Sequence, residues 1–297
     1  MSGLAIQSRN IGVIIPPTDP ISADFCACDF WCKWEEKVFA DPSSVGVWAS
    51  DTTSFLSRKV TSSDTLEIKL FRYGSEVATI TDNTYGTYYA AGNFSAQPLY
   101  VGWVADWTLI YNAFSGGQYY VTISGTLAGN DYSFTSRKFR LILWNEEVAD
   151  GTVKVESYHT GNILSNNFDY TDLIDGGWYS SIRLDARFGK RKPVLEVDEF
   201  LNTSYRSVQN RTTVAHEYTL QSRYMPNSLL EKLSDDTLLG NDVYLTDYSL
   251  INERKYQRTS VVTTSYEEIE INDWTTGEGR YTILFSERVQ NTIKRNF

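Results

Sequence analysis

The sequence has few of the side chains that carry most acid–base, nucleophilic and metal chemistry. Among its 297 residues there are only two histidines, His159 and His216, three cysteines and two methionines. Histidine is the side chain whose charge changes most readily near neutral pH, and general acid–base catalysis uses it more often than any other. This scarcity favours a protein that works through its surfaces, and we expect no enzymatic activity.

Sequence motifs of common catalytic and metal sites are also missing. The chain has no GxSxG, no HExxH, no phosphate-binding loop and no dinucleotide fingerprint. Cys26, Cys28 and Cys32 lie within seven residues, but their spacing does not match the paired CxxC of zinc sites. In a strand all three project to one face, and cysteine is often buried. We therefore predict reduced core cysteines, no bound metal and no cofactor.

The two histidines are expected to play structural parts. His216 lies in an alternating run and His159 closes another, so both fit hydrogen-bonding positions in strands. Carboxylates alone remain in number, and a pair of them would suit a polysaccharide-cleaving enzyme. Their separation in space does not follow from the sequence, and exposed acidic loops are far commoner in proteins than catalytic carboxylate pairs. The candidates are Asp235, Asp236 and Asp242, and Glu267, Glu268 and Glu270.

Long apolar runs are absent as well. No segment approaches the ~18 apolar residues of a membrane span, so no membrane insertion is expected. The apolar run at 11–15 is too short for a signal-peptide core, and no basic start precedes it. These features predict a protein made in a cytoplasm, where thiols stay reduced.

An excess of basic charge is absent too. Acidic residues outnumber basic ones by 37 to 27, for a formal net charge of −10. A field of that sign repels phosphate backbones, so no nucleic-acid partner is expected. The densest basic run is Lys190-Arg191-Lys192, which we interpret as a solvated hairpin turn between strands at 179–188 and 194–200.

Aromatic residues, by contrast, are plentiful. Trp 8, Tyr 20 and Phe 14 occur mostly in short alternating runs, as in Leu66–Tyr73, which is the pattern of a half-buried strand. Such runs, separated by Gly, Asn, Asp and Ser clusters, predict a mainly β protein built from β-sandwich or barrel domains. Strands are expected at 25–34, 45–50, 65–73, 76–81, 85–90, 99–104, 107–112, 118–125, 132–144, 153–159, 179–188, 194–200, 212–221, 243–248, 256–264, 267–271 and 281–285.

The chain is long enough for two domains. We expect an extended N-terminal arm at 1–24, a first β domain at 25–167 and a second at 168–297. One short helix near 227–239 is expected in the second domain. Pro226 opens it, Leu229, Leu230 and Leu233 share a face, and Gly240 follows its end.

The N-terminal arm is a candidate interface. Its prolines forbid a helix, and its apolar side chains have no local partner. Burying such side chains in a neighbour contributes about 1.5–3 kcal/mol each before ordering costs. We therefore expect the arm to bind copies of the same chain or other subunits, through Ile11, Val13, Ile14, Ile15, Pro16 and Pro17.

Four tryptophans lie near expected turns, where exposed aromatic faces would stack on sugar rings or on a partner protein. Large amphipathic aromatics are enriched at protein interfaces, although core packing is the commonest fate of any single one. These candidates for exposure are Trp103, Trp107, Trp178 and Trp274.

The C-terminal part resembles structural proteins of tailed bacteriophages, especially those infecting Bacteroidetes-type hosts. The resemblance is carried by Pro226–Leu233, Asp242–Leu245, Tyr281–Phe285 and the closing Asn291–Phe297. It covers roughly the last hundred residues and includes no diagnostic motif, so no functional residue is carried over. It implies a tail, baseplate or head–tail connector component.

These observations lead to one leading hypothesis and two alternatives. The leading hypothesis is a non-enzymatic structural subunit of a phage particle, located in the virion after synthesis in the host cytoplasm, with copies of itself and other virion subunits as partners. The first alternative is a glycan-binding β-sandwich module that recognises a host surface. The second is the polysaccharide-cleaving enzyme.

Overall fold

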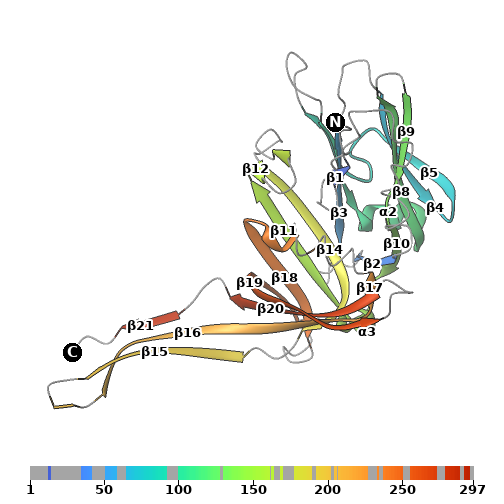
Figure 1. Ribbon diagram of the computed structural model, residues 1–297. Helices are drawn as coiled ribbons and strands as arrows, with labels where there is room; N and C mark the ends of the chain where they lie inside the picture. Colours follow the sequence, from blue (N-terminus) through green and yellow to red (C-terminus); the bar gives the residue numbers. More distant parts are fainter. Residues whose placement is uncertain are drawn as a thin grey trace.

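Figure 1 shows the computed structural model of the chain. The residues it describes are 13–14, 35–41, 51–58, 65–91, 100–127, 130–160, 162–163, 168–169, 177–188, 192–201, 204–205, 207–226, 233, 237–249, 255–272, 278–287 and 291–294. The described chain is mostly strand, with several sheets, which confirms the expected mainly β fold.

Two sheets form the N-terminal part. The first has four strands in the order β1 (Val13–Ile14), β3 (Thr52–Arg58), β7 (Tyr100–Asp106) and β6 (Gly86–Ala91). The second has six strands. Its path runs through β2 (Glu35–Ala40), β10 (Lys138–Leu143), β8 (Gly117–Leu127), β4 (Leu66–Arg72) and β5 (Ser75–Ile80), with β9 (Asn130–Thr135) also paired to β8.

These two sheets pack face to face around one apolar core, as in a β-sandwich. Phe55 of the first sheet meets Phe139 of the second edge to face, with ring centroids 6.0 Å apart. Phe55 also stacks on Trp103 at 5.7 Å, and Trp107 lies 4.9 Å from Phe139. Pairs of this geometry add to the stability that burial alone provides.

The described chain between β7 and β11 (Thr152–Thr160) contains two helices, and one of them replaces an expected strand. The range 107–112, predicted as a strand, lies in α2 (Trp107–Phe114). The local reason is the N-cap Asp106, whose carboxylate accepts from the N–H groups of Thr108 and Leu109 and so satisfies the first turn. The second helix, α3 (Glu146–Asp150), is capped in the same way by Asn145.

The expected strand at 132–144 is interrupted once. β9 and β10 lie in succession along one edge of β8, and Ser136 separates them. The Ser136 hydroxyl oxygen accepts from the N–H of Val121 at 2.9 Å, in place of a ladder carbonyl. Sequence alternation did not reveal β2 or β3, and the expected strands at 25–34 and 45–50 lie outside the described residues.

The C-terminal part contains a closed ring of six antiparallel strands. Each strand pairs with the next, and β16 pairs with both β14 and β20, which closes the ring. In order around the ring the strands are β16 (Ser207–Ser222), β14 (Gly177–Phe188), β11 (Thr152–Thr160), β18 (Asp242–Ser249), β19 (Lys255–Asn272) and β20 (Glu278–Glu287). Alternate side chains from these strands form one buried apolar cluster inside this barrel.

Several short elements surround the barrel. β17 (Met225–Pro226) pairs with β20, and η3 (Thr237–Leu239) is a single 3₁₀ turn. β12 (Asn162–Ile163) and β13 (Phe168–Asp169) form a separate two-stranded sheet. Of the helix expected at 227–239, the structure describes Leu233, buried in the barrel core, and η3; the remaining residues lie outside the described part. The expected boundary after residue 167 stays a prediction, and β11, which precedes it, pairs with β14 and β18.

The basic run at 190–192 does not join two strands of a hairpin, contrary to our expectation. β14 and β15 (Lys192–Leu201) pair one after the other with the same edge of β16. Ala186–Phe188 face Leu220–Ser222, and the pairing resumes with Lys192 opposite Glu217. The two strands therefore continue in one direction, and the chain reverses only after β15.

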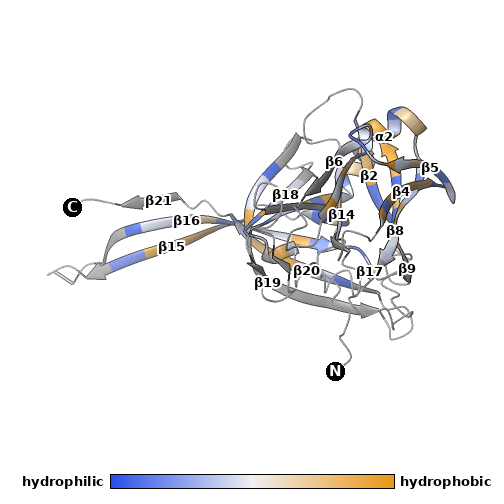
Figure 2. Ribbon diagram, turned by 90° about the horizontal axis from the view of Figure 1, so that it is seen from above, coloured by the Kyte–Doolittle hydropathy of each residue, from blue (hydrophilic) through white to orange (hydrophobic). Residues whose placement is uncertain are grey.

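This continuation produces a ribbon that leaves the barrel. β15 runs beside residues 207–217 of β16, and β21 (Asn291–Lys294) pairs with residues 211–214 on the other edge of β16. We call β15, residues 207–216 of β16, and β21 the β-ribbon. Figures 1 and 2 both show it extending away from the other strands. Ten residues of strand correspond to about 33 Å of length.

Candidate functional site

The β-ribbon exposes almost all of the described part of β15. Leu195 is 63% exposed and Val197 is 40% exposed, although both are large apolar side chains. Only Val194 among the residues 192–199 is partly buried. At the tip Tyr205 is also exposed, with a positive φ of 56°. Large apolar side chains that stay exposed together on a projecting element indicate a contact surface.

The two faces of the β-ribbon differ in chemistry. On one face Leu195 lies opposite Val214 and Val197 lies opposite Thr212. On the other face Glu196 lies opposite Thr213 and Asp198 opposite Arg211. Because side chains alternate along a strand, one face is mainly apolar and the other carries the charges of Glu196 and Asp198. We call the face that carries Pro193, Leu195, Val197, Thr212 and Val214 the apolar face. The Val194–Ala215 pair also lies on the charged face, and His216 lies beside Pro193 on the apolar face.

The root of the β-ribbon is fixed to the barrel by one carboxylate. Glu287 at the end of β20 accepts from the Tyr218 hydroxyl at 2.6 Å and lies 2.9 Å from Nδ1 of His216. At the end of β16, the N–H of Tyr281 in β20 donates to the Ser222 hydroxyl at 3.0 Å. His216 therefore has a structural position, where the ribbon joins the barrel.

A buried ionic seam joins the barrel to the sandwich. In β14, Ile182 and Leu184 point into the barrel core, while Arg183 between them points out at the sandwich. Its guanidinium donates to both carboxylate oxygens of Asp51, at 2.8 and 2.7 Å. Beside it the Ser181 hydroxyl donates to the carbonyl of Thr52 at 2.5 Å. Such bidentate pairs fix orientation as well as position.

A second buried pair extends this seam. Arg137 donates from Nε to Glu36 at 2.6 Å, and Arg183 donates from its backbone N–H to the other Glu36 oxygen at 2.6 Å. Burial raises the pKa of Glu36, against the lowering effect of the Arg137 charge. Near the surface of the seam, Lys37 donates to Asp185 at 2.6 Å.

A third group in the seam centres on Glu156 of β11. Burial alone would raise the pKa of Glu156, but Lys154, the Tyr179 hydroxyl and Arg258 lower it below its usual value. Arg258 donates to Glu156 at 2.9 Å. Burial, followed by the charge of Glu156, raises the pKa of Tyr179. The seam thus holds sandwich and barrel as one platform, from which the β-ribbon projects.

The other histidine lies inside the described fold. His159, at the end of β11, is fully buried, and its Nε2 lies 3.2 Å from the Ser157 hydroxyl. Burial lowers the pKa of His159 to about 4. A histidine with this pKa stays neutral near pH 7, which agrees with a structural part and offers no exposed base.

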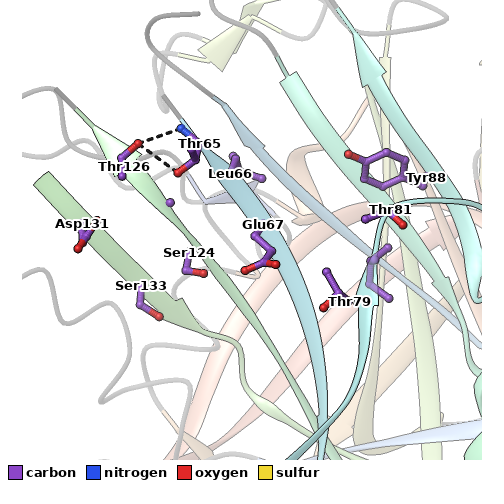
Figure 3. A pocket seen from close by; sticks show the side chains of 12 residues that line it. Thr65, Leu66, Glu67, Thr79, Thr81, Tyr88, Ser124, Thr126, Asp131 and Ser133 are labelled. Carbon is purple, nitrogen blue, oxygen red and sulfur yellow. Dashed lines mark hydrogen bonds between the residues drawn. The ribbon is translucent and has the colours of Figure 1, made fainter. Parts of the chain in front are cut away.

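A groove lined mainly by hydroxyl residues, which we call the polar groove, lies along the second sheet, and Tyr88 of β6 in the first sheet also lines it (Figure 3). It has a volume of about 750 Å³. Hydroxyl side chains form most of its lining, with the carboxylates of Glu67 and Asp131 among them and Tyr88 at one side. Thr65 and Thr126 join by their hydroxyls at 3.1 Å across neighbouring strands. The hydroxyl residues are Thr65, Thr79, Thr81, Tyr88, Ser124, Thr126 and Ser133.

Two of the four tryptophans proposed as exposed are buried. Trp103 and Trp107 are each 0% exposed and belong to the sandwich core. The indole Nε1 of Trp107 donates to the Thr53 hydroxyl at 2.9 Å, so its polar atom is satisfied inside the core. Trp178 lies in β14 opposite His159, and its side chain and Trp274 lie outside the described part.

Other predicted positions fall partly outside the described residues. The three cysteines, Asp235 and Asp236 lie there, while Asp242 begins β18 opposite Tyr158. Of the N-terminal arm, only Val13 and Ile14 are described, and they pair with Leu56 and Ser57 of the same chain. These two residues pair within their own chain, and the expected contact of the arm with a neighbouring subunit stays a prediction. Ile11, Ile15, Pro16 and Pro17 lie outside the described part.

Two further findings concern metal clusters and membrane spans. Within the described ranges, no cluster of three or more His, Cys, Asp or Glu residues is arranged to hold a metal ion. Those same ranges contain no helix with the length and apolar character of a membrane span.

No family model matches the chain, and no curated protein is detectably similar to it.

Proposed function

We propose that the chain is a non-enzymatic structural subunit of a larger particle and that the β-ribbon is its principal contact with neighbouring subunits. The observation that supports this most is the apolar face of a projecting ribbon, with Leu195 and Val197 exposed. A side chain of this kind costs free energy in water, and covering it against a partner regains that free energy.

The buried seam between barrel and sandwich supports the same proposal. Arg183 and Asp51 join barrel and sandwich by a buried bidentate pair, which fixes the orientation of the barrel that carries the ribbon. A preorganised barrel lowers the ordering cost when the projecting ribbon docks. The chain therefore resembles a preformed building block more closely than a hinged enzyme.

We further propose that the particle is a phage virion, with the chain in its tail, baseplate or head–tail connector. The support for this finer assignment is the resemblance of the C-terminal segments, including Asp242–Leu245 in β18 and Tyr281–Phe285 in β20. Both segments lie in the barrel from which the ribbon projects. Virion location and synthesis in the host cytoplasm belong to the same proposal.

The absence of enzymatic activity is part of the proposal and has its own support. Perturbed pKa values mark candidate active sites when the groups lie in a cleft. The buried carboxylates with shifted pKa values, Glu36 and Glu156, lie in the seam, and neither lines the polar groove. The groove carboxylates Glu67 and Asp131 are exposed.

Glycan binding is the second candidate function, and the polar groove is the observation that favours it. Its hydroxyls and the carboxylates of Glu67 and Asp131 suit the hydroxyl groups of a sugar, and Tyr88 offers an aromatic ring. The Glu67→Gln/Asp131→Asn variant tests it by calorimetry against host polysaccharide. Binding by the wild type that this variant loses would support the glycan function, and the absence of binding by the wild type would remove it.

Electron microscopy of purified chains tests the leading proposal. We compare the wild type with Leu195→Lys/Val197→Lys, which places two charges on the apolar face of the ribbon. The matched control is Leu109→Lys/Leu143→Lys, because these two leucines are 40% and 45% exposed on the sandwich. All three proteins are expected to fold, since each substitution lies at an exposed position.

The proposal predicts assemblies for the wild type and the control and single subunits for the ribbon variant. Assemblies that persist in the ribbon variant would show that the ribbon is not the contact. Single subunits for all three proteins would contradict the structural function itself.

A further inference from the structure

We propose that two copies of the chain pair through the open edge of β15, antiparallel, about a two-fold axis that passes through Leu195. This inference rests on the proposed function, since it names the partner of the β-ribbon as a second copy of the same chain. It predicts a continuous sheet in which β15 of each copy lies between its own β16 and the second β15.

The first observation is an unpaired strand edge. β15 is the terminal strand of its sheet path, and its described pairing is with β16 alone. An edge strand presents a row of N–H and C=O groups with no strand partner, which is a template for another strand. The edge is also accessible, because the ribbon extends away from the sandwich and barrel (Figures 1 and 2).

The second observation is that β15 is complementary to its own reverse. With Leu195 opposite Leu195 of the second copy, Pro193 lies opposite Val197 and Lys192 lies opposite Asp198. The apolar side chains then meet on one face. On the other face Lys192 meets Asp198 and Val194 meets Glu196. The two-fold axis repeats each pair, so the interface contains two Lys192–Asp198 contacts and a row of six apolar side chains, three from each copy. An interface about a two-fold axis requires this kind of self-complementarity.

The third observation concerns Pro193, which would hinder most strand pairings. Proline in a sheet is found at an edge, with its nitrogen on the open side. Leu195 and Val197 then direct their N–H groups to the same side, because backbone direction alternates along a strand. In the proposed register the Leu195 residues exchange two hydrogen bonds, and each Val197 N–H donates to a Pro193 carbonyl. Proline therefore removes only the bond that its own N–H would have given.

Two alternative registers are poorer. A shift of one residue sets Leu195 opposite Glu196, so the charged and apolar faces no longer match. A shift of two residues towards the tip sets Leu195 opposite Val197 and Glu196 opposite Glu196 of the second copy, which places like charges together. The charges on this strand therefore act against incorrect pairing, as charges on edge strands generally do.

Cysteine cross-linking tests the register. Leu195→Cys places two thiols opposite each other, with Cα atoms about 5.5 Å apart in a hydrogen-bonded pair, within the range that a disulfide spans. The matched control is Val197→Cys on the same face, whose symmetry mates lie four residues out of register, roughly 13 Å along the strands. The background is the wild-type chain with its native cysteines, and peptide mass spectrometry locates each cross-link.

The inference predicts a covalent dimer for Leu195→Cys under mild oxidation and none through position 197 in Val197→Cys. A mixture of Pro193→Cys and Val197→Cys chains is expected to form only the mixed dimer between the new thiols. Equal cross-linking at 195 and 197 would overturn the register, and no cross-link at either position would overturn the pairing.

The outcome separates this inference from the proposed function. If Leu195→Lys/Val197→Lys abolishes assembly while Leu195→Cys gives no cross-link, the ribbon binds another surface of a second copy, and only the inference is wrong. If the lysine variant assembles normally and no cross-link forms, both are wrong. Circular dichroism confirms that each cysteine variant is folded before oxidation.

Discussion

Replacing Arg183 with methionine is expected to weaken the seam between barrel and sandwich. Arg183 is buried, and its guanidinium donates to both oxygens of Asp51 and to the Thr152 hydroxyl at 3.1 Å. It also lies over the ring of Phe39, with its central carbon 4.3 Å from the ring centroid. Methionine retains the apolar stem and the contact with the ring, but it removes every side-chain donor. Asp51 then loses its bidentate partner inside the protein.

Removal of one member of a buried ion pair costs about 3–5 kcal/mol, because the other charge is left uncompensated. Asp51 keeps the Phe39 N–H at 2.8 Å and Lys154 at 3.8 Å. We therefore expect a loss near the lower limit, about 3 kcal/mol of unfolding free energy. For a chain of this size, 1 kcal/mol changes Tm by about 2–4 °C, which gives a decrease of roughly 6–12 °C.

Urea unfolding followed by circular dichroism and tryptophan fluorescence measures this loss. The control is Arg140→Met, which removes an exposed arginine 3.8 Å from Glu35 and is expected to change stability by less than about 1 kcal/mol. The double variant Asp51→Asn/Arg183→Met is expected to be less destabilised than the sum of its single variants, since it leaves no unpaired charge. A value for Arg183→Met equal to that of the control, or additive effects in the double variant, would refute this reasoning.

Three more predictions follow from the fold. The pKa of His159 is about 4 in the folded chain, below its unfolded value of 6.5, so the unfolded chain binds the proton first as the pH falls. The free energy of unfolding is therefore unaffected above pH 6.5 and decreases towards pH 4, by about 3 kcal/mol. His159→Gln should make the free energy of unfolding, measured by urea titration, depend less on pH over this range. Gly86→Ala should unfold the sandwich at lower temperature by calorimetry, because φ is +144° and a Cβ would lie 2.0 Å from the Val104 carbonyl oxygen; an unchanged Tm would be unexpected. Asp106→Ala should cost about 1 kcal/mol through loss of the α2 cap, whereas Asp106→Asn should retain most of it.

Local alternation predicted most strands because one face of each is apolar. The sequence around β4, β8 and β14 has this pattern, and the structure confirms these strands. Prediction from alternation failed at β2, where Glu36 is buried against Arg137, a residue 101 positions away. A charged residue at a core-facing position breaks the apolar pattern, and no local signal indicates its partner.

The candidate site was partly hidden for a related reason. Alternation indicated strands at 194–200 and 212–221, but strand prediction does not say which strands pair. Because β14 and β15 both pair with one edge of β16, the structure has a projecting ribbon where the sequence predicted a hairpin. The aromatic side chain of Trp107 favours a strand by local propensity, which is why a strand is predicted there. The structure instead forms a helix, whose first turn Asp106 caps.

The β-ribbon gives a direct test of assembly. Val194 and Ala215 are directly paired, so an Asn-Gly turn that replaces residues 195–214 closes the hairpin near its root. Sedimentation velocity of the wild type and of this shortened chain measures their masses under identical conditions. The account predicts a species of two or more chains for the wild type and a folded species of one chain for the shortened protein. A wild type that sediments as a single 33.8 kDa chain, or a shortened protein that assembles as the wild type does, would contradict it.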